Sequence, residues 1–458
     1  MLINRGLQRV INLLVIAFLA VLAFSGGMMT LPSHSPVGPM LGNLFNSKDV
    51  LREFFHTLDP RKVADAVNQN PQLLAGVLPN LDPDVIAGVV NENSQFVSDL
   101  VGRLDPQTTA SLINENYEFL NQVMNHIDPQ VISQVVNENA SFVTEIMQYL
   151  DPFQVAMLIN ENEPFAIEVV GALNPKVIAN VINYNGDFLT RVVGHLDPRV
   201  LVRAVNENPR LAVELVGMID PRVAAMVVNE NGRFLISVLG RLDPKVLAAA
   251  VNANGRFLVD LLGYMDPEVV AEALNENQDM VYEVVTLLEP QFIATIINNQ
   301  PFVTSLIGYL NPASIAGSIN SRGSFVTSLL GFLDPSVIAE AVSANVEWVE
   351  SLIGELDGEQ LGHILDSNAD FMTDFVGALS TSTVASIVNG NQAWVTRLIG
   401  ELDPSVIAGA VSDNATWLNS LIGELDGEQL GHILDSNADF MTDFVGALSP
   451  ETIASVIN

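Results

Sequence analysis

The chain of 458 residues contains no cysteine. This excludes disulfide bonds, thiolate metal sites, c-type haem attachment, a thiol nucleophile and an N-terminal lipid-modified cysteine. Basic residues are also scarce, because 19 Lys and Arg stand against 53 Asp and Glu, and the formal net charge is −34. Since the phosphates of nucleic acids are bound chiefly by Lys and Arg, this balance argues against a nucleic-acid partner.

Charged residues make up only 16% of the chain and hydrophobic residues 49%, which is too apolar for a disordered protein. The charge is unevenly distributed. Up to Phe257 there are 17 basic and 25 acidic residues, whereas from Leu258 onward only Arg322 and Arg397 are basic, against 28 acidic residues. The second half is therefore predicted to present a negative surface, which either attracts cations and basic partners or keeps the protein soluble.

The longest hydrophobic run lies near the N-terminus. Residues 10–24 are apolar except for Asn12, and the run extends to Leu31 through small and apolar residues. The shorter stretch fits the core of a signal peptide, and the longer one is sufficient to span a bilayer. Residues 1–31 are therefore predicted to be a signal peptide or a membrane anchor, in the form of one hydrophobic N-terminal helix, with a buried helix as the alternative.

The basic residues around this run predict its orientation. Arg5 and Arg9 precede it, and no Lys or Arg follows until Lys48. The positive-inside rule then places the rest of the chain outside the cytoplasm, either membrane-anchored or secreted to the cell surface. If the segment is not cleaved, it also contacts the membrane. Residues 32–46, which include several Pro and Gly, are predicted to be a linker.

From Leu58 onward the chain is a tandem repeat. A Leu-Asp-Pro-like marker recurs eighteen times, ending at Leu448, and every interval is 23 residues except the 22 between Leu288 and Leu310. A fixed period in this range is the signature of a solenoid. Residues 58–458 are therefore predicted to form an all-α, extended α-solenoid of about seventeen and a half helix-turn-helix repeats.

The consensus of the repeat is L-D-P-x-V-I-A-x-V-V-N-E-N-x-x-F-V-x-x-L-V-G-x, numbered from its Leu. Asp at position 2 and Pro at position 3 start a first helix, with apolar residues at 5, 6, 9 and 10. Asn at position 11 is expected to end it, because Asn tolerates the left-handed conformation. Asn at position 13 is expected to cap a second helix with apolar positions 16, 17, 20 and 21, which Gly at position 22 stops.

Two columns of the repeat allow a functional interpretation as well as a structural one. Position 16 is mostly aromatic and includes Trp348, Trp394 and Trp417. Its spacing within the apolar face favours core packing over a stacking platform for ligands. The Asn residues at positions 11 and 13 predict turn capping, with bonds along the solenoid or a ligand-binding polar ladder as alternatives.

The two ends of the array are complementary. Residues 47–57 match the second half of a repeat, with Val50 and Leu51 at positions 16 and 17, whereas residues 448–458 match only the first half. One hypothesis is that these halves dock head to tail between chains, and the alternative is a frayed end. Residues 351–380 also recur without change as residues 420–449, which indicates a recent duplication of three repeats.

The duplicated segment contains the one metal-like pattern. Asp366, Asn368, Asp370 and Asp374 resemble the start of a calcium loop, and Asp435, Asn437, Asp439 and Asp443 repeat it. The pattern lacks the Gly and the Glu that such a loop carries at its sixth and twelfth positions. Helix capping, with Asp near a positive helix end, is the alternative interpretation. No metal site is assigned with these residues.

No catalytic constellation is evident. The six His residues do not cluster, and no Ser/His/Asp set, phosphate-binding Gly loop or HExxH motif occurs. We therefore expect no enzymatic activity and no cofactor.

The pattern Leu-Asp-Pro-x-x-x-Ala, as in Leu81-Asp82-Pro83 with Ala87, resembles the N-terminal solenoid domain of MgtE-type magnesium transporters and the packing in FliG-like proteins. The resemblance implies a solenoid of short paired helices and a possible role in cation sensing. It does not extend to the Asn-Glu-Asn turn, and those domains are cytoplasmic and precede several membrane helices.

Together these features predict an exported or membrane-tethered repeat scaffold or spacer that mediates protein–protein interaction in a cell-envelope or surface assembly. Two alternatives remain: a surface filament or adhesin that self-assembles head to tail, and a cation-responsive regulatory solenoid. The expected partners are proteins or further copies of the chain.

Overall fold

The computed structural model describes residues 58–457. The predicted signal peptide or anchor (1–31), linker (32–46) and half-repeat (47–57) lie outside the described residues. Between residues 58 and 457 every regular element is a helix, in regular alternation of a first and a second helix per repeat. The prediction of an all-α solenoid is confirmed. Along this part of the chain no helix is by itself long and apolar enough to cross a bilayer, although three bent helix pairs meet that criterion jointly.

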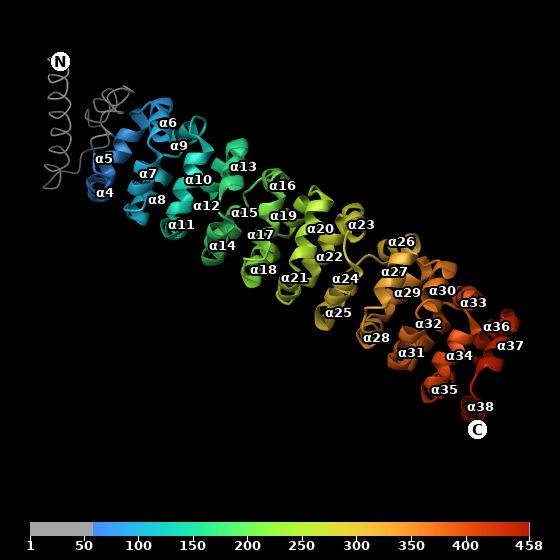
Figure 1. Ribbon diagram of the computed structural model, residues 1–458. Helices are drawn as coiled ribbons and strands as arrows, with labels where there is room; N and C mark the ends of the chain where they lie inside the picture. The colour runs from blue at the N-terminus through green and yellow to red at the C-terminus, as the bar shows by residue number, and fades with distance from the viewer. Residues whose placement is uncertain (1–57, 458) are drawn as a thin grey trace, which may run out of the picture. The chain divides into compact units, whose positions relative to one another are not determined.

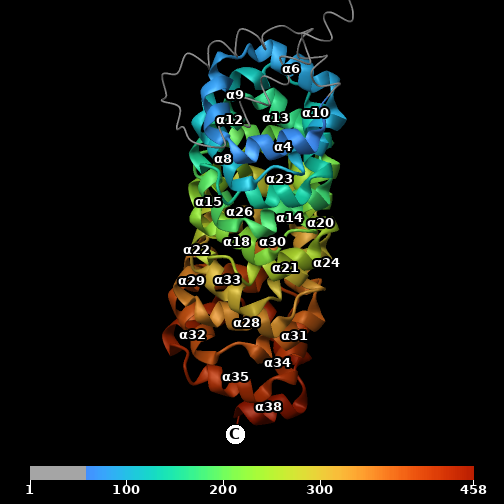
Figure 2. The same ribbon diagram turned by 90° about the vertical axis from the view of Figure 1, so that its left-hand side faces the viewer.

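The chain divides into two compact units, one up to Phe234 and one from Leu235. Within each unit the helices follow one another in chain order, blue to green in the first unit and yellow to red in the second (Figures 1 and 2). The helices of the first unit are α4 (Pro60–Gln69), α5 (Pro71–Val77), the short 3-10 helix η1 (Leu78–Asn80), α6 (Pro83–Glu92), α7 (Ser94–Val101), α8 (Pro106–Glu115), α9 (Tyr117–Met124), α10 (Pro129–Glu138), α11 (Ala140–Ile146), α12 (Pro152–Glu161), α13 (Glu163–Ala172), α14 (Pro175–Tyr184), α15 (Gly186–Val193), α16 (Pro198–Glu207), α17 (Pro209–Val216) and α18 (Pro221–Glu230). Helix α19 (Gly232–Leu239) contains the boundary.

The second unit continues the same alternation. Its helices are α20 (Pro244–Ala253), α21 (Gly255–Leu262), α22 (Pro267–Glu276), α23 (Gln278–Val285), α24 (Pro290–Ile297), α25 (Gln300–Ile307), α26 (Pro312–Ser321), α27 (Gly323–Leu330), α28 (Pro335–Ala344), α29 (Val346–Glu355), α30 (Gly358–Asp366), α31 (Ala369–Ala378), α32 (Thr381–Gly390), α33 (Gln392–Glu401), α34 (Pro404–Asp413), α35 (Ala415–Ile422), α36 (Gly427–Ser436), α37 (Ala438–Ala447) and α38 (Pro450–Ile457).

The first helix of each repeat begins as the sequence predicts. In α6, for example, Asp82 is the N-cap, its carboxylate accepts a hydrogen bond from the Asp84 N–H at 3.0 Å, and Pro83 is the first helical residue. The cap satisfies one of the N–H groups that a helix start leaves without a partner, and proline has no N–H to satisfy. This start is encoded within three residues of sequence.

The joint between the two helices of a repeat differs from the expectation. Asn91, at position 11, lies inside α6, which continues to Glu92, so the prediction that position 11 ends the helix is wrong. The joint is the single residue Asn93 at position 13, with φ −129° and ψ 40°. It precedes α7, but its side chain makes no capping bond to that helix. Instead the Asn93 amide donates back to the Val89 carbonyl at 2.8 Å and closes the end of the first helix.

Consecutive helices turn sharply, and this sets the packing. The chain changes direction by 110° between α13 and α14 and by 112° between α27 and α28. Three such turns nearly complete a circle, so each helix packs against the helix three elements later, as α10 does on α13 and α28 on α31. Within each unit the helices therefore form a spiral of about three per turn, and one turn corresponds to one and a half repeats.

The tightest point of this packing is position 7, which the sequence analysis did not assign to the core. Small side chains occupy it in nearly every copy, and Ala87, Ala110, Ala156, Ala316 and Ala339 are all fully buried. At this position Gly362 faces the backbone of Glu401 on α33, one turn later, and a methyl group there would lie 3.1 Å from that carbonyl oxygen. A small residue is needed because two helix backbones approach each other directly.

Candidate functional site

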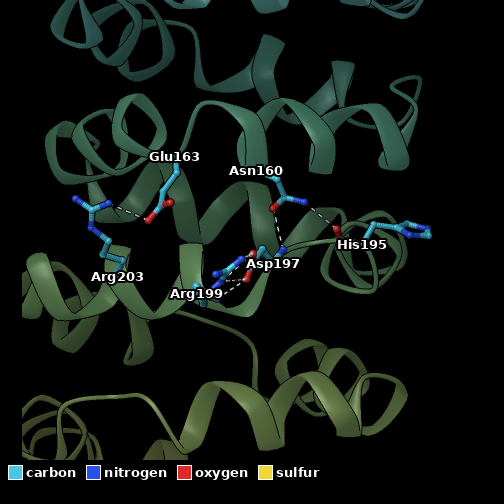
Figure 3. Close-up of polar contacts among 6 residues, drawn as sticks. All are labelled: Asn160, Glu163, His195, Asp197, Arg199 and Arg203. Atoms are coloured by element: carbon cyan, nitrogen blue, oxygen red, sulfur yellow. Dashed lines mark hydrogen bonds and ion pairs between the residues drawn. The ribbon is translucent and has the colours of Figure 1, made fainter.

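The recurring polar residues of the array gather at the corners where one helix ends and the next begins. At one such corner Asn160, at position 11 of its repeat, bridges to the link one turn later (Figure 3). Its amide nitrogen donates to the His195 carbonyl at 3.0 Å, and its amide oxygen accepts from the Asp197 N–H at 2.8 Å. One side chain thus satisfies a backbone acceptor and a backbone donor that the helix ends leave open.

The same two-bond clamp recurs along both units. In each case the amide donates to a carbonyl 34 or 35 residues later and accepts from an N–H 36 or 37 residues later. The clamps are made by Asn68, Asn91, Asn114, Asn137, Asn160 and Asn183 in the first unit and by Asn275, Asn298, Asn320 and Asn389 in the second. The Asn at position 11 therefore forms hydrogen bonds along the solenoid, which the sequence analysis gave as an alternative to turn capping.

Positions 12 and 13 bond in the opposite direction, to the turn before. At one corner the buried Ser98 hydroxyl donates to the Glu138 carboxylate, and this bond lowers the pKa of Glu138 below its usual value. The Asn139 amide donates to the Ser98 hydroxyl at 3.0 Å and to the Ser98 carbonyl at 3.1 Å. The Asn-Glu-Asn turn therefore ties each corner to the turns before and after it.

The second helix ends directly before the glycine at position 22 in α7, α15 and α17, as predicted, whereas α13, α29 and α31 continue through it. Gly102 has φ −63° and ψ −2°, a right-handed conformation open to any residue. A methyl group on Gly102, however, would clash with the Asn139 amide oxygen, and Gly240 has the same relation to Asn277. In these copies position 13, two repeats later, occupies the space of a side chain, whereas no such neighbour lies against Gly331 or Gly354.

The aromatic column at position 16 lies in the core, as predicted. Trp394 and Phe188 are 8% and 5% exposed. Each of the three Trp residues also donates its indole N–H to the carbonyl of a position-1 leucine 38 residues earlier, at 2.7–3.1 Å. The indole N–H is thereby satisfied without water, and the ring joins successive turns.

One corner replaces the amide by a cation. Arg322 occupies position 13, and its guanidinium lies 3.5 Å from the centre of the Tyr282 ring one turn earlier. This cation–π contact takes the place of the Asn bond to the preceding turn. It accounts for one of the only two basic residues after Leu258.

We expect Asn160→Ala to lower the free energy of unfolding by about 1–3 kcal/mol, because two hydrogen bonds are lost and a backbone N–H and a carbonyl lose their partners. Urea unfolding followed by circular dichroism measures this. Arg203→Ala is the comparison variant, because Arg203 bridges the same two turns through an exposed ion pair with Glu163 at 3.0 Å (Figure 3). An exposed ion pair contributes little, and equal losses in the two variants would contradict the assigned role of Asn160.

Asp366 is an exception among the clamps because a carboxylate stands at position 11. Both of its oxygens lie 3.0 Å from the Asp403 N–H, but an ionised carboxylate has no hydrogen to donate to the next carbonyl. Burial raises the pKa of Asp366 above its usual value, and the Asp403 carboxylate adds to this, while the Asp403 N–H and His363 oppose it. The N-cap carboxylate of Asp403 shows the reverse, since hydrogen bonds from Ser405 lower its pKa.

We expect Asp366→Asn to stabilise the protein at pH 7 by about 1 kcal/mol, through the added hydrogen bond and the loss of a partly desolvated charge. A raised pKa in the folded state means that folding favours the protonated carboxyl, so the native Asp366 destabilises the fold above its folded pKa and this effect disappears as pH falls. The stabilisation by Asp366→Asn should therefore shrink towards pH 4, where thermal unfolding of both proteins is compared.

The duplicated segment supplies the control. Asp435 has the same local sequence as Asp366, but no residue 37 positions later belongs to the described chain. Asp435→Asn makes the same charge change without completing a clamp, so we expect a much smaller effect. Equal stabilisation by the two substitutions would show that net charge, and not the clamp, is responsible.

The calcium-loop candidates do not converge. Asp366 accepts from the Asp403 N–H, and the Asn368 amide donates to the Ile364 carbonyl at 2.8 Å. Asp370 and Asp374 are exposed on α31. In the second copy the Asn437 amide donates to the Ile433 carbonyl at 3.0 Å, and Asp435, Asp439 and Asp443 are exposed. Among residues 58–457 no group of three or more Asp, Glu or His side chains is placed to hold a metal ion.

The described chain includes a polar recess and an apolar one. In the first unit a pocket of about 510 Å³ lies beside one corner, with Glu115, Glu118 and Asp151 as carboxylates and Tyr117 and Phe153 as aromatic walls. Burial, together with the nearby Glu161, raises the pKa of Tyr117 to about 12, so its hydroxyl remains a donor and bonds Glu161 at 2.9 Å.

The second recess, in the second unit, is a groove of about 460 Å³ with a wholly apolar lining. It is bounded by α33 to α38 and their links, and sequence reasoning did not anticipate it. Its lining includes Ile422, Phe440, Phe444, Val445 and Ile453.

No family model matches the chain, and no curated protein matches it. Among solved structures, an engineered protein is 14% identical, with 88% of this chain and 98% of that chain covered and a TM-score of 0.35. SYS-1 is 11% identical over 94% of this chain and 87% of its own, with a TM-score of 0.28. A mutant of Kap121p is 14% identical over 90% of this chain and 48% of its own, with a TM-score of 0.26. Likeness at this level carries no argument about function.

Proposed function

We propose that this protein is a non-enzymatic scaffold or spacer, exported or membrane-tethered, that mediates protein–protein interaction in a cell-envelope or surface assembly. One observation carries the proposal. The polar residues that recur from copy to copy are engaged in bonds between turns, as Asn160 is with His195 and Asp197. The conserved pattern of the repeat therefore maintains the spiral, and contact with partners falls to the side chains that vary.

Position 23 is the most prominent of these variable surfaces. The backbone carbonyl of position 23 accepts the hydrogen bond from the clamp amide, but its side chain points outward and differs between copies. Tyr149, Tyr264, Tyr309 and Phe332 are 46%, 53%, 52% and 49% exposed. Exposed aromatic side chains are typical anchors of protein interfaces. Support for export comes from the apolar run of residues 1–31 and the basic residues that precede it.

The test uses the full chain in the cells that produce it. Tyr264 and Tyr309 are each replaced by a photoreactive phenylalanine analogue, and Ala249, an exposed residue on the helix face of α20, is replaced likewise as the control. We expect ultraviolet light to link the two position-23 variants to the same discrete envelope proteins and the control to none. Identical adducts at all three positions would contradict a specific interaction surface.

Export is tested separately, by adding protease to intact cells that carry the chain. Digestion of residues 58–458 without lysis is expected. Full protection until the cells are lysed would overturn the envelope location and leave the scaffold proposal standing.

A further inference from the structure

The duplicated segment provides an internal comparison of one sequence in two environments. Residues 351–380 and 420–449 are identical, yet their apolar side chains differ in burial. Ile353 is 6% exposed, whereas its counterpart Ile422 is 41% exposed. Met372 is buried and Met441 is not, and Val445 is 48% exposed. Since the sequence is the same, the difference lies in what covers the second copy.

In the first copy, Ile353 is buried by side chains of a later helix. Ile353 packs in one cluster with Trp394 and Val395 of α33. These residues stand at positions 16 and 17 of a second helix, two repeats after Ile353. The equivalent cover for Ile422 is a second helix that follows α38, and the described residues end with α38. Ile422 lines the apolar groove described above, at the place that a further second helix would cover.

Residues 47–57 have the sequence of such a helix. Val50 and Leu51 stand at the two positions that Trp394 and Val395 occupy in α33, and Phe54 and Phe55 stand at positions 20 and 21. A second helix is also the next element in the alternation after α38, which is a first helix.

Charge does not oppose this docking. Residues 47–57 have no net formal charge, because Lys48 and Arg52 balance Asp49 and Glu53, whereas residues 398–458 contain many carboxylates and no Lys or Arg. Packing of residues 47–57 therefore adds no net negative charge to the acidic end of the array.

We propose that residues 47–57 of a second copy of this chain pack into the apolar groove, with Val50 and Leu51 against Ile422, so that chains associate head to tail. A second copy of the chain is then one protein partner of the proposed scaffold. The inference rests on the proposed function only in this respect. The spiral of one chain then continues into the next without a change of helix order, as expected for a heterologous contact that repeats along a fibre.

The absence of cysteine allows a direct test. One full-length variant carries Leu51→Cys and another carries Ile422→Cys, and the two are mixed under oxidising conditions. We expect a disulfide-linked heterodimer, because side chains in contact bring their Cβ atoms within disulfide range. The control partner carries Tyr184→Cys, at a side chain that is 76% exposed and lies outside the groove, and it should remain unlinked to Leu51→Cys.

A second measurement does not depend on disulfide geometry. Ile422→Asp should abolish the concentration-dependent rise in mass seen by sedimentation equilibrium, with an unchanged circular dichroism spectrum, because Ile422 is exposed in the single chain. Tyr184→Asp, at an exposed side chain outside the groove, should leave the rise intact. A wild-type chain of constant monomeric mass, or a Leu51–Ile422 bridge within one chain of the double variant, would overturn the proposal. Crosslinks of position 23 to other proteins are independent of Ile422, so failure here is distinguishable from failure of the scaffold function.

Discussion

Replacement of Ala248 by leucine is expected to lower the free energy of unfolding by about 1–3 kcal/mol, because added methylenes in a filled core force neighbouring backbones apart. Ala248 stands at position 7 of α20, is 3% exposed, and lies where α20 packs against α23. The spacing of the turns depends on this approach, so the strain is shared with adjacent repeats. Thermal or urea unfolding of the full chain measures the effect.

The control is the next residue. Ala249 lies on the same helix but is exposed, so Ala249→Leu adds the same atoms without crowding the turn above. We expect its effect on the free energy of unfolding to be near zero, since leucine and alanine have similar helix propensities. If Ala249→Leu is as harmful as Ala248→Leu, position 7 is not the point of closest approach.

Deletion of residues 351–419 is expected to leave a folded protein with an unchanged midpoint of unfolding. The deletion joins Glu350 to Ser420, and because residues 420–449 repeat residues 351–380, every local sequence at the junction is preserved. Three repeats contain six helices, or two complete turns of the spiral, so the same faces remain aligned on either side of the junction. Helix content per residue, measured by circular dichroism, should be the same as in the full chain.

A shorter deletion should be far more harmful. Removal of residues 351–385 takes away 35 residues, the sequence separation of the Asn clamp, and therefore about one turn. It fuses the start of α29, a second helix, to the end of α32, a first helix, and breaks their alternation. We expect helix content per residue to fall and the unfolding transition to broaden. If both deletions are tolerated equally, the order of first and second helices does not determine the packing.

The fold class was predictable because its signals are local. The Asp-Pro start of each first helix acts within three residues, as Asp82 and Asp84 show, and the apolar spacing of a helix is visible along one stretch of chain. The aromatic column was also correctly placed in the core, since its members fall on the apolar face of the second helix.

The roles of the amides were not predictable in the same way. A side-chain amide both donates and accepts, and a capping bond and a bond to the next turn satisfy it equally well. Only the fold shows that Asn160 bonds His195 and Asp197 while Asn93 bonds Val89. The exposure of Ile422 was hidden for the same reason, because an identical sequence is buried at Ile353.

By itself, then, the sequence determined the repeat length, the two helices of each copy and their apolar faces, because each follows from interactions among residues close in the chain. The tertiary structure decided which helices touch. The sharp turns between consecutive helices make every third helix a neighbour, and this geometry assigns small side chains to position 7 and a clamp to position 11. Those assignments depend on contacts between residues more than thirty positions apart, which no local pattern specifies.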